Sequence, residues 1–188
     1  MSGLVNWYVF FVKTGYERKA IEDFQSIFKE SEAIPRQLFV ESFFKRNGVT
    51  KLEKRNIFPG YIFAISSIEN YEFIIRSKEC IKKSNVILKI LCYGDTCQAA
   101  LHRDESAILE ELWEEGDCLR VSKGIIIGDR VQIIEGPFAG KESLIKKINY
   151  HKMQALIELE IMGAYREVTI GLNIVKRLKT TDSNNIVV

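Results

Sequence analysis

Histidine is scarce in this chain of 188 residues, and its cysteines are not arranged as metal ligands. The two histidines, His102 and His151, lie far apart, and none of the four cysteines forms a Cys-x-x-Cys pair. Structural zinc sites need clustered ligands at regular spacing. The sequence therefore predicts no metal, no bound cofactor, and four reduced cysteines that pack as small apolar side chains.

Catalytic groupings are also lacking, because no Ser-His-Asp, Cys-His or paired-carboxylate arrangement stands out. The segment that begins at Gly136 has some likeness to a phosphate-binding loop. That loop needs four residues between its glycines and a Ser or Thr directly after its Lys. Here three residues separate Gly136 from Gly140, and Glu142 follows Lys141. An enzyme that acts on nucleotides is thus an alternative that the sequence opposes.

Long apolar runs are absent, since none approaches the ~20 residues needed to span a bilayer. The opening Met-Ser-Gly-Leu-Val-Asn has no basic stretch followed by an apolar stretch, as a signal peptide would. Hydrophobic residues make up 46% and charged residues 28% of the chain, which is typical of soluble globular proteins. These features predict a cytoplasmic protein without a membrane partner, built as one medium or two small domains.

The net charge of +2 conceals an uneven distribution. Residues 104–118 hold seven acidic side chains and no Lys or Arg. Residues 1–103 carry a net charge of +5, and residues 119–188 carry +4. Basic lobes suit a polyanion such as nucleic acid. Charge alone favours the simpler interpretation, two solvated surfaces of mild charge.

The first part of the chain alternates strand and helix patterns. Trp-Tyr-Val-Phe-Phe-Val at 7–12 is typical of a strand covered on both faces, and the apolar stripe over 17–30 is typical of an amphipathic helix. Further strands are expected over 38–44, 57–65 and 86–92, and further helices over 69–78 and from Asp104. The order β-α-β-β-α-β-α predicts an α+β domain over residues 1–115, one antiparallel sheet with helices packed on it.

The pattern changes around Gly116. Residues 116–128 are interpreted as a linker with a short extended stretch. Alternation with frequent turns then predicts five short strands, at about 130–135, 143–149, 154–161, 165–170 and 174–178. Five short strands over residues 129–179 favour a small closed barrel, because closure removes exposed sheet edges. Residues 180–188 are expected to be a flexible tail.

Three sequence blocks are similar to one known family. Gly128–Lys141, with its Gly-Asp opening and its Gly-Pro-Phe-Ala-Gly loop, resembles a KOW motif. Trp7-Tyr8-Val9 with Gly15-Tyr16-Glu17, and Phe58-Pro59-Gly60-Tyr61, resemble the N-terminal domain of NusG proteins. In this order and spacing the chain resembles the NusG family of transcription elongation factors, over about residues 7–178. The resemblance implies a NusG-type domain followed by a five-stranded, SH3-like KOW barrel.

The same resemblance implies two protein partners. In NusG proteins one apolar face of the first domain docks on the clamp of RNA polymerase, and the barrel recruits a ribosomal small-subunit protein or Rho. The candidates for polymerase binding are Phe11, Tyr16, Phe58 and Tyr61. The candidates for the barrel's partner are Pro137, Phe138 and Met162. The alternative for the polymerase candidates is that they are internal core.

A basic hairpin departs from the housekeeping pattern of the family. Its cations, together with a second pair of lysines, are the candidates for nucleic-acid binding: Lys45, Arg46, Lys51, Lys54, Arg55, Lys82 and Lys83. They suggest a specialised antiterminator similar to LoaP, which recognises a nascent RNA hairpin in operon leaders. The alternatives are a solvated turn, a general NusG factor that contacts DNA non-specifically, and a ribosomal-type KOW protein that binds RNA.

Overall fold

A computed structural model describes residues 6–113 and 116–178, and the chain divides into two units. Unit 1 comprises Met1–Phe39, Asn56–Cys118 and Leu159–Arg166. Unit 2 comprises Val40–Arg55, Leu119–Glu158 and Glu167–Val188. The expected tail, 180–188, lies outside the described residues.

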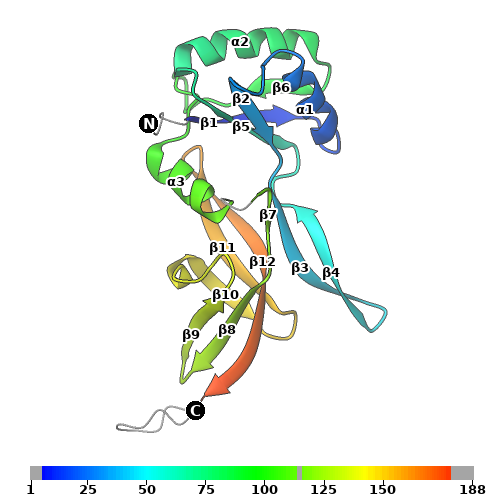
Figure 1. The fold of residues 1–188 in the computed structure, drawn as a ribbon, viewed down its shortest axis with the longest axis vertical. Helices are drawn as coiled ribbons and strands as arrows, with labels where there is room; N and C mark the ends of the chain where they lie inside the picture. The colour runs from blue at the N-terminus through cyan, green and yellow to red at the C-terminus, as the bar shows by residue number, and fades with distance from the viewer. Residues whose placement is uncertain (1–5, 114–115, 179–188) are drawn as a thin grey trace. The chain divides into compact units, whose positions relative to one another are not determined.

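Unit 1 is built on a four-stranded sheet of order β2-β5-β1-β6 (Figure 1). Its strands are β1 (Asn6–Val12), β2 (Ala33–Arg36), β5 (Tyr61–Ser66) and β6 (Ile87–Ile90). Every pairing is antiparallel, with Val9 opposite Phe63 at the centre. The apolar run at 7–12 therefore forms a central strand, as the pattern predicted.

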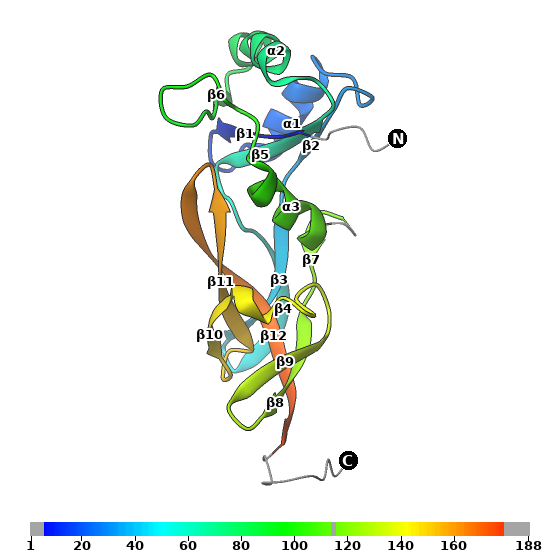
Figure 2. The same ribbon diagram turned by 90° about the vertical axis from the view of Figure 1, so that its left-hand side faces the viewer.

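Helices cover both faces of this sheet. Helices α1 (Glu17–Gln25) and α2 (Asn70–Lys83) lie on one side, and α3 (Arg103–Leu112) lies on the other (Figures 1 and 2). Beneath α1 and α2, an aromatic core includes Tyr8 stacked on Phe73, with 3.7 Å between ring centroids. The α+β class is confirmed, although α1 is shorter and α2 longer than the sequence predicted.

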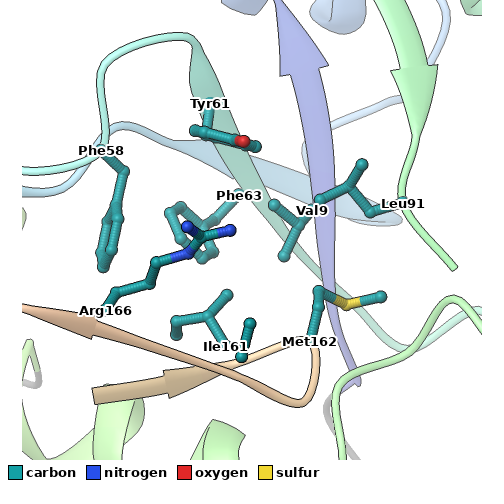
Figure 3. Close-up of a pocket in the computed structure, with 9 residues that line it drawn as sticks. Val9, Phe58, Tyr61, Phe63, Leu91, Ile161, Met162 and Arg166 are labelled. Carbon is teal, nitrogen blue, oxygen red and sulfur yellow. The ribbon is translucent and has the colours of Figure 1, made fainter. Parts of the chain in front are cut away.

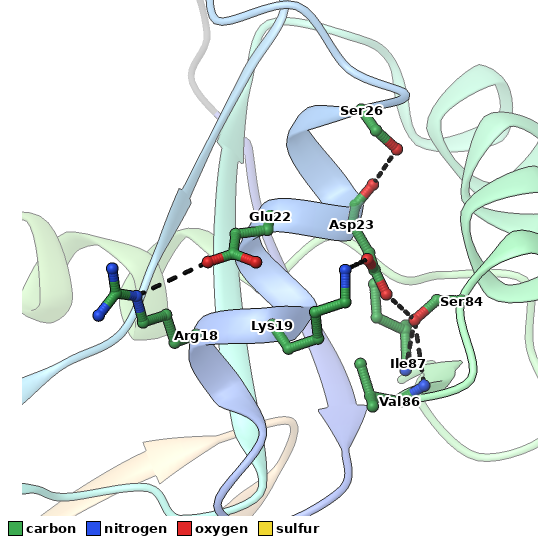
Figure 4. A network of polar contacts seen from close by, with 8 residues as sticks. All are labelled: Arg18, Lys19, Glu22, Asp23, Ser26, Ser84, Val86 and Ile87. Atoms are coloured by element: carbon green, nitrogen blue, oxygen red, sulfur yellow. Dashed lines mark hydrogen bonds and ion pairs between the residues drawn. The ribbon is translucent and has the colours of Figure 1, made fainter.

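A polar network ties α1 to the turn after α2 (Figure 4). The Ser84 hydroxyl donates to an Asp23 carboxylate oxygen at 2.6 Å and accepts the backbone N–H groups of Val86 and Ile87. Lys19 pairs with the same carboxylate at 2.7 Å. The bonds from Lys19, and then from Ser84, lower the pKa of Asp23. Ser84 thus ends α2 and orients the chain into β6.

One strand prediction is wrong in its placement. Residues 38–44 were expected to join the main sheet, but β3 (Phe39–Arg46) forms a separate sheet with β4 (Val49–Asn56) and β7 (Cys118–Leu119). The unforeseen β2 pairs with β5 instead. Residues 49–55 of β4 are all exposed, and such a polar strand has no face to bury in the main sheet.

Unit 2 contains a five-stranded sheet of order β10-β11-β12-β8-β9. The strands are β8 (Ser122–Ile127), β9 (Arg130–Glu135), β10 (Ile145–Asn149), β11 (Gln154–Ile161) and β12 (Ala164–Leu178), and a short 3-10 turn, η1 (Glu142–Leu144), precedes β10. β8 pairs with β12 in parallel. The expected linker, 116–128, is therefore corrected: its second half is a strand of this sheet. The two strands expected after residue 165 form one long strand.

Candidate functional site

The turn between Phe58 and Tyr61 is shaped by its own sequence. The Tyr61 N–H donates to the Phe58 carbonyl at 3.0 Å, with Pro59 and Gly60 in the middle. Gly60 has a φ of +83°, which suits the third position of a type II turn. A Cβ atom there would lie 2.9 Å from the Thr14 hydroxyl oxygen. Only glycine fits without strain.

A buried carboxylate fixes this turn against the start of α1. Glu17 is 6% exposed, and its carboxylate accepts the Gly60 N–H at 2.7 Å. The Gly60 carbonyl accepts the Val12 N–H at 2.8 Å. The hydrogen bond between Glu17 and Gly60, which lie 43 residues apart, thereby joins the Gly15-Tyr16-Glu17 and Phe58–Tyr61 segments. The side chains of Phe58 and Tyr61 are consequently held in place beside the end of β1.

An aromatic surface, the β1–β5 aromatic face, forms on the side of the sheet opposite α1 and α2. Because side chains alternate along a strand, Val9 and Phe11 point away from the core that contains Tyr8. The Phe11 and Tyr61 rings lie 5.4 Å apart, as do the rings of Phe58 and Phe63. Four aromatic rings from β1, β5 and the preceding turn thus form one apolar surface.

The tip of the β11–β12 hairpin, residues 161–166, covers part of this face within unit 1. A cavity of ≈ 80 Å³ remains between them. In Figure 3, Ile161, Met162 and Arg166 extend from the tip towards Val9, Phe58 and Phe63. The remaining lining residues are Tyr61, Leu91 and Ala164. The face is therefore an occupied surface in this structure.

The predicted polymerase-binding residues differ in exposure. Tyr16 is 55% exposed, Phe11 and Tyr61 are half-buried, and Phe58 is only 8% exposed. The structure brings Phe11, Phe58 and Tyr61 together on the aromatic face. Val9, Phe63 and Leu91 also line the cavity, although no sequence motif marked them as binding residues.

The three residues predicted to bind the barrel's partner, Pro137, Phe138 and Met162, do not form one exposed site in the structure. Phe138 is fully buried, and its N–H donates to the Ser122 hydroxyl at 3.3 Å. Direct contact with a partner, as predicted for Phe138, needs an exposed ring, but the ring lies in the interior and its backbone is fixed to Ser122 of β8. Pro137 is half-buried nearby in unit 2, whereas Met162 belongs to unit 1 and lines the cavity.

The basic hairpin β3–β4 turns at Asn47-Gly48, with φ values of 52° and 80°, as a two-residue type I′ turn requires. Lys45, Lys51, Lys54 and Arg55 are all exposed, and the side chain of Arg46 lies outside the described residues. Alternation places Lys51 and Arg55 on one face of β4 and Lys54 on the other. The hairpin cations therefore divide between two faces.

The cationic candidates also divide between the two units. Arg55 lies over the Phe44 ring, 4.6 Å from its centroid, within the hairpin of unit 2. Lys82 and Lys83 are exposed in the last turn of α2, in unit 1. Among residues 6–113 and 116–178, no group of three His, Cys, Asp or Glu side chains is placed to hold a metal ion. No helix in these ranges is long and apolar enough to cross a membrane.

Comparison with known proteins agrees with this architecture. The family model described as "Transcription termination factor nusG" matches residues 5–109, and the KOW motif model matches residues 127–160. The chain belongs to the NusG family. The predicted resemblance to a NusG-type domain followed by a KOW motif is thus confirmed, in that order.

Several NusG relatives match along most of the chain. A Pseudomonas aeruginosa protein named "Transcription termination/antitermination protein NusG" is 24% identical over 181 residues, covering 92% of this chain and 98% of that protein. A Lactococcus lactis protein of the same name is 27% identical over 160 residues, covering 81% of this chain and 83% of that protein. A solved structure described as "Domain interaction in Thermotoga maritima NusG" is 16% identical, with a TM-score of 0.45, covering 89% of this chain and 93% of that one.

Proposed function

We propose that this NusG-family chain is a cytoplasmic transcription elongation and antitermination factor that binds RNA polymerase through the β1–β5 aromatic face. The observation that carries the proposal is the fixed turn: Glu17 holds Gly60, and so sets Phe58 and Tyr61 beside Phe11. Clusters of aromatic side chains often contribute most of the binding free energy of a protein interface. The names of the relatives point to the same process.

The proposed action is a shift between states of the polymerase clamp. A factor that binds the closed clamp better than the open clamp moves the equilibrium by the difference between its two affinities. Pausing and termination, which accompany clamp opening, would then become less frequent. The chain's own contribution is binding, and the proposal needs no catalytic group or cofactor.

The barrel is proposed to bind a second protein, a ribosomal small-subunit protein or Rho. Burial of Phe138 removes the ring itself from such a contact surface. The half-buried Pro137 and the exposed Ala139 and Gly140 remain on the loop. We therefore assign the contact to the outer surface of this loop.

The β3–β4 hairpin is proposed to bind structured nucleic acid, and a leader RNA hairpin in particular, which would direct the factor to specific operons. Lys51 and Arg55 lie on the same face of β4, and both are exposed. The deep major groove of RNA hides base edges from protein side chains, so these cations would contact backbone and shape first. Each lost phosphate contact should lower the salt slope of binding by about 0.7–0.9.

Charge reversal on one face at a time tests this proposal. The Lys51→Glu, Arg55→Glu double variant is compared with Lys45→Glu, Lys54→Glu, which changes the same number of charges. Binding is measured at fixed salt to a leader hairpin and to an RNA with a scrambled stem. We expect the first variant to lose at least about tenfold in affinity for the leader hairpin, and the second to lose less.

A general elongation factor is the second candidate, favoured by the shared name of the relatives. It predicts equal affinity for the two RNAs and equal loss of elongation activity on every template when the cations are reversed. That result would contradict recruitment to specific operons. Transcription in vitro on a leader template and on an unrelated template, with and without the protein, separates the two candidates.

A further inference from the structure

A glutamine side chain fixes the basic β3–β4 hairpin to the barrel strands within unit 2. The Gln154 side-chain amide, at the start of β11, donates to the Ser42 hydroxyl at 3.1 Å and to the Phe43 carbonyl at 2.8 Å. Ser42 is fully buried at this contact. A Cβ atom on Gly171 would lie 2.7 Å from the Glu41 carbonyl oxygen, so β12 needs glycine where β3 lies against it. The hairpin and the barrel strands are therefore in direct contact along β3.

The hairpin face in contact with the barrel also carries cations. Side chains alternate along a strand, so Phe44 lies on the same face of β3 as Ser42. Arg55 lies over the Phe44 ring, 4.6 Å from its centroid, and Lys51 shares a face of β4 with Arg55. Both cations are exposed. Lys51 and Arg55 thus lie on the side of the hairpin that the barrel contacts.

The turn between β10 and β11, residues 150–153, adds an aromatic ring and further cations beside this face. It directly precedes the glutamine that binds the hairpin, and the Asn149 side chain fixes its shape by accepting the Lys152 N–H at 3.0 Å. The Tyr150 ring is 43% exposed, although Arg177 of β12 lies over it, 4.7 Å from the ring centroid. Tyr150 and Arg177 therefore form a stacked pair that is open to solvent.

The cations around this turn lack the carboxylate partners that other lysines of the barrel have. Lys123 pairs with Glu135 at 2.9 Å, and Lys146 pairs with Glu158 at 3.1 Å. Among residues 6–113 and 116–178, no carboxylate forms an ion pair with the four cations of the surface, which are Lys51, Arg55, Lys152 and Arg177. Cations without an internal partner beside an exposed ring suit a nucleic-acid strand, whose phosphates need cations and whose unpaired bases stack.

We propose that these residues form one RNA-binding surface, in which the barrel binds an unpaired loop base while β3–β4 binds the stem. Tyr150 stacks on the loop base, Arg177 and Lys152 contact loop phosphates, and the stem phosphates contact Lys51 and Arg55. This inference rests on the proposed binding of RNA by the β3–β4 hairpin, and it adds an unpaired loop as a second requirement. Stacking on an aromatic ring tolerates any base, because every base has a π face. The stem is recognised by its backbone and shape.

The full chain is tested with two RNAs that share one stem: a hairpin closed by a uridine loop, and a blunt duplex without the loop. Tyr150→Ala removes the ring and no charge, whereas Tyr150→Phe keeps the ring. Tyr165→Ala is the matched control, because it removes an exposed tyrosine of β12 that lies in unit 1. Arg177→Gln is compared with Lys176→Gln, which removes the same charge from the other face of β12.

Wild-type protein should bind the hairpin RNA at least about fivefold more tightly than the duplex, since stacking of one base contributes that much affinity. Tyr150→Ala should lose this preference and keep its affinity for the duplex, whereas Tyr150→Phe and Tyr165→Ala should retain the preference. Arg177→Gln should lower the salt slope of hairpin binding by about 0.7, the value for one phosphate of a single strand, and Lys176→Gln should not.

Several results would overturn the inference. Equal affinity of wild-type protein for the hairpin and the duplex would show that no loop base is bound. An equal loss on both RNAs in Tyr150→Ala would show that the ring supports the fold or the stem contact instead. A DNA hairpin of the same sequence that binds as tightly as the RNA would refute RNA as the specific occupant of the surface.

Failure of the proposed function gives different results. Binding of neither RNA by wild-type protein would refute the RNA contact of β3–β4, and this inference with it. Equal affinity for a leader hairpin and a scrambled stem, with the Tyr150-dependent preference for a loop retained, would refute recruitment to specific operons and support the composite surface.

Discussion

Replacing Phe58 by Ala should destabilise unit 1 as well as remove a ring from the proposed interface. Phe58 is 8% exposed, and its ring lies 5.4 Å from that of Phe63. Truncation of a buried Phe to Ala costs about 3–5 kcal/mol. A cavity of ≈ 80 Å³ already borders the ring, so its neighbours lose fewer contacts. We therefore expect Phe58→Ala to lower the free energy of unfolding by about 3 kcal/mol, near the lower end of that range.

Tryptophan fluorescence provides a specific assay for this loss. The chain has two tryptophans, and both Trp7 and Trp113 are buried in unit 1. The unfolding transition seen by fluorescence should move down by roughly 10 °C in Phe58→Ala, at about 2–4 °C per kcal/mol for a chain of this size. Phe58→Leu keeps most of the apolar volume and should cost only about 1 kcal/mol.

An unchanged transition in Phe58→Ala would refute the packing of this ring beneath the hairpin tip. If Phe58→Ala melts early while Phe58→Leu is stable, Phe58→Leu becomes the variant in which polymerase binding can be measured without unfolding.

Two further predictions concern packing and pH. Phe138→Ala should destabilise unit 2 by about 3–5 kcal/mol, because the ring is fully buried; hydrogen exchange in β8 and β12 measures this, and unchanged protection would contradict it. Arg76 donates two hydrogen bonds of 2.9 Å to the Glu32 carboxylate. These bonds, and after them the bond from the Lys29 N–H, lower the pKa of Glu32 from 4.5 to about 2. A lowered folded-state pKa gives stability that is complete above the unfolded value and is lost as pH falls from about 4.5 to about 2. Arg76→Met should flatten the decline in melting temperature over that range, and an equally steep decline would show that the pair does not contribute.

Local sequence was sufficient for much of the fold. The run at 7–12 is apolar on both faces, and it forms a strand with helices on both sides. Asn47-Gly48 predicts its hairpin because few residues accept two successive positive φ values. The KOW glycines likewise mark a loop whose geometry they alone permit, since Gly136 and Gly140 have φ of 101° and 75°.

Contacts between distant residues account for what the sequence did not reveal. Phe138 was predicted to contact the barrel's partner, and nothing in its loop indicates that Ser122, 16 residues earlier, accepts its N–H. β8 lies in a stretch whose Gly and Asp residues resemble a linker. Glu105 lies in the first turn of α3, and its carboxylate accepts the Gly163 N–H. Its bond to Gly163 spans 58 residues, and no local pattern encodes such a pairing.

Polymerase binding by the β1–β5 aromatic face is tested most directly by the affinity of this chain for purified core RNA polymerase when one ring of the face is removed. Tyr61→Ala removes a half-buried ring that lies against Phe11, and Tyr71→Ala removes a ring on α2 that is 73% exposed. Loss of an interface aromatic typically costs at least about 2 kcal/mol, or roughly 30-fold in affinity. We expect that loss for Tyr61→Ala and wild-type affinity for Tyr71→Ala. Equal affinities for the two variants would contradict it.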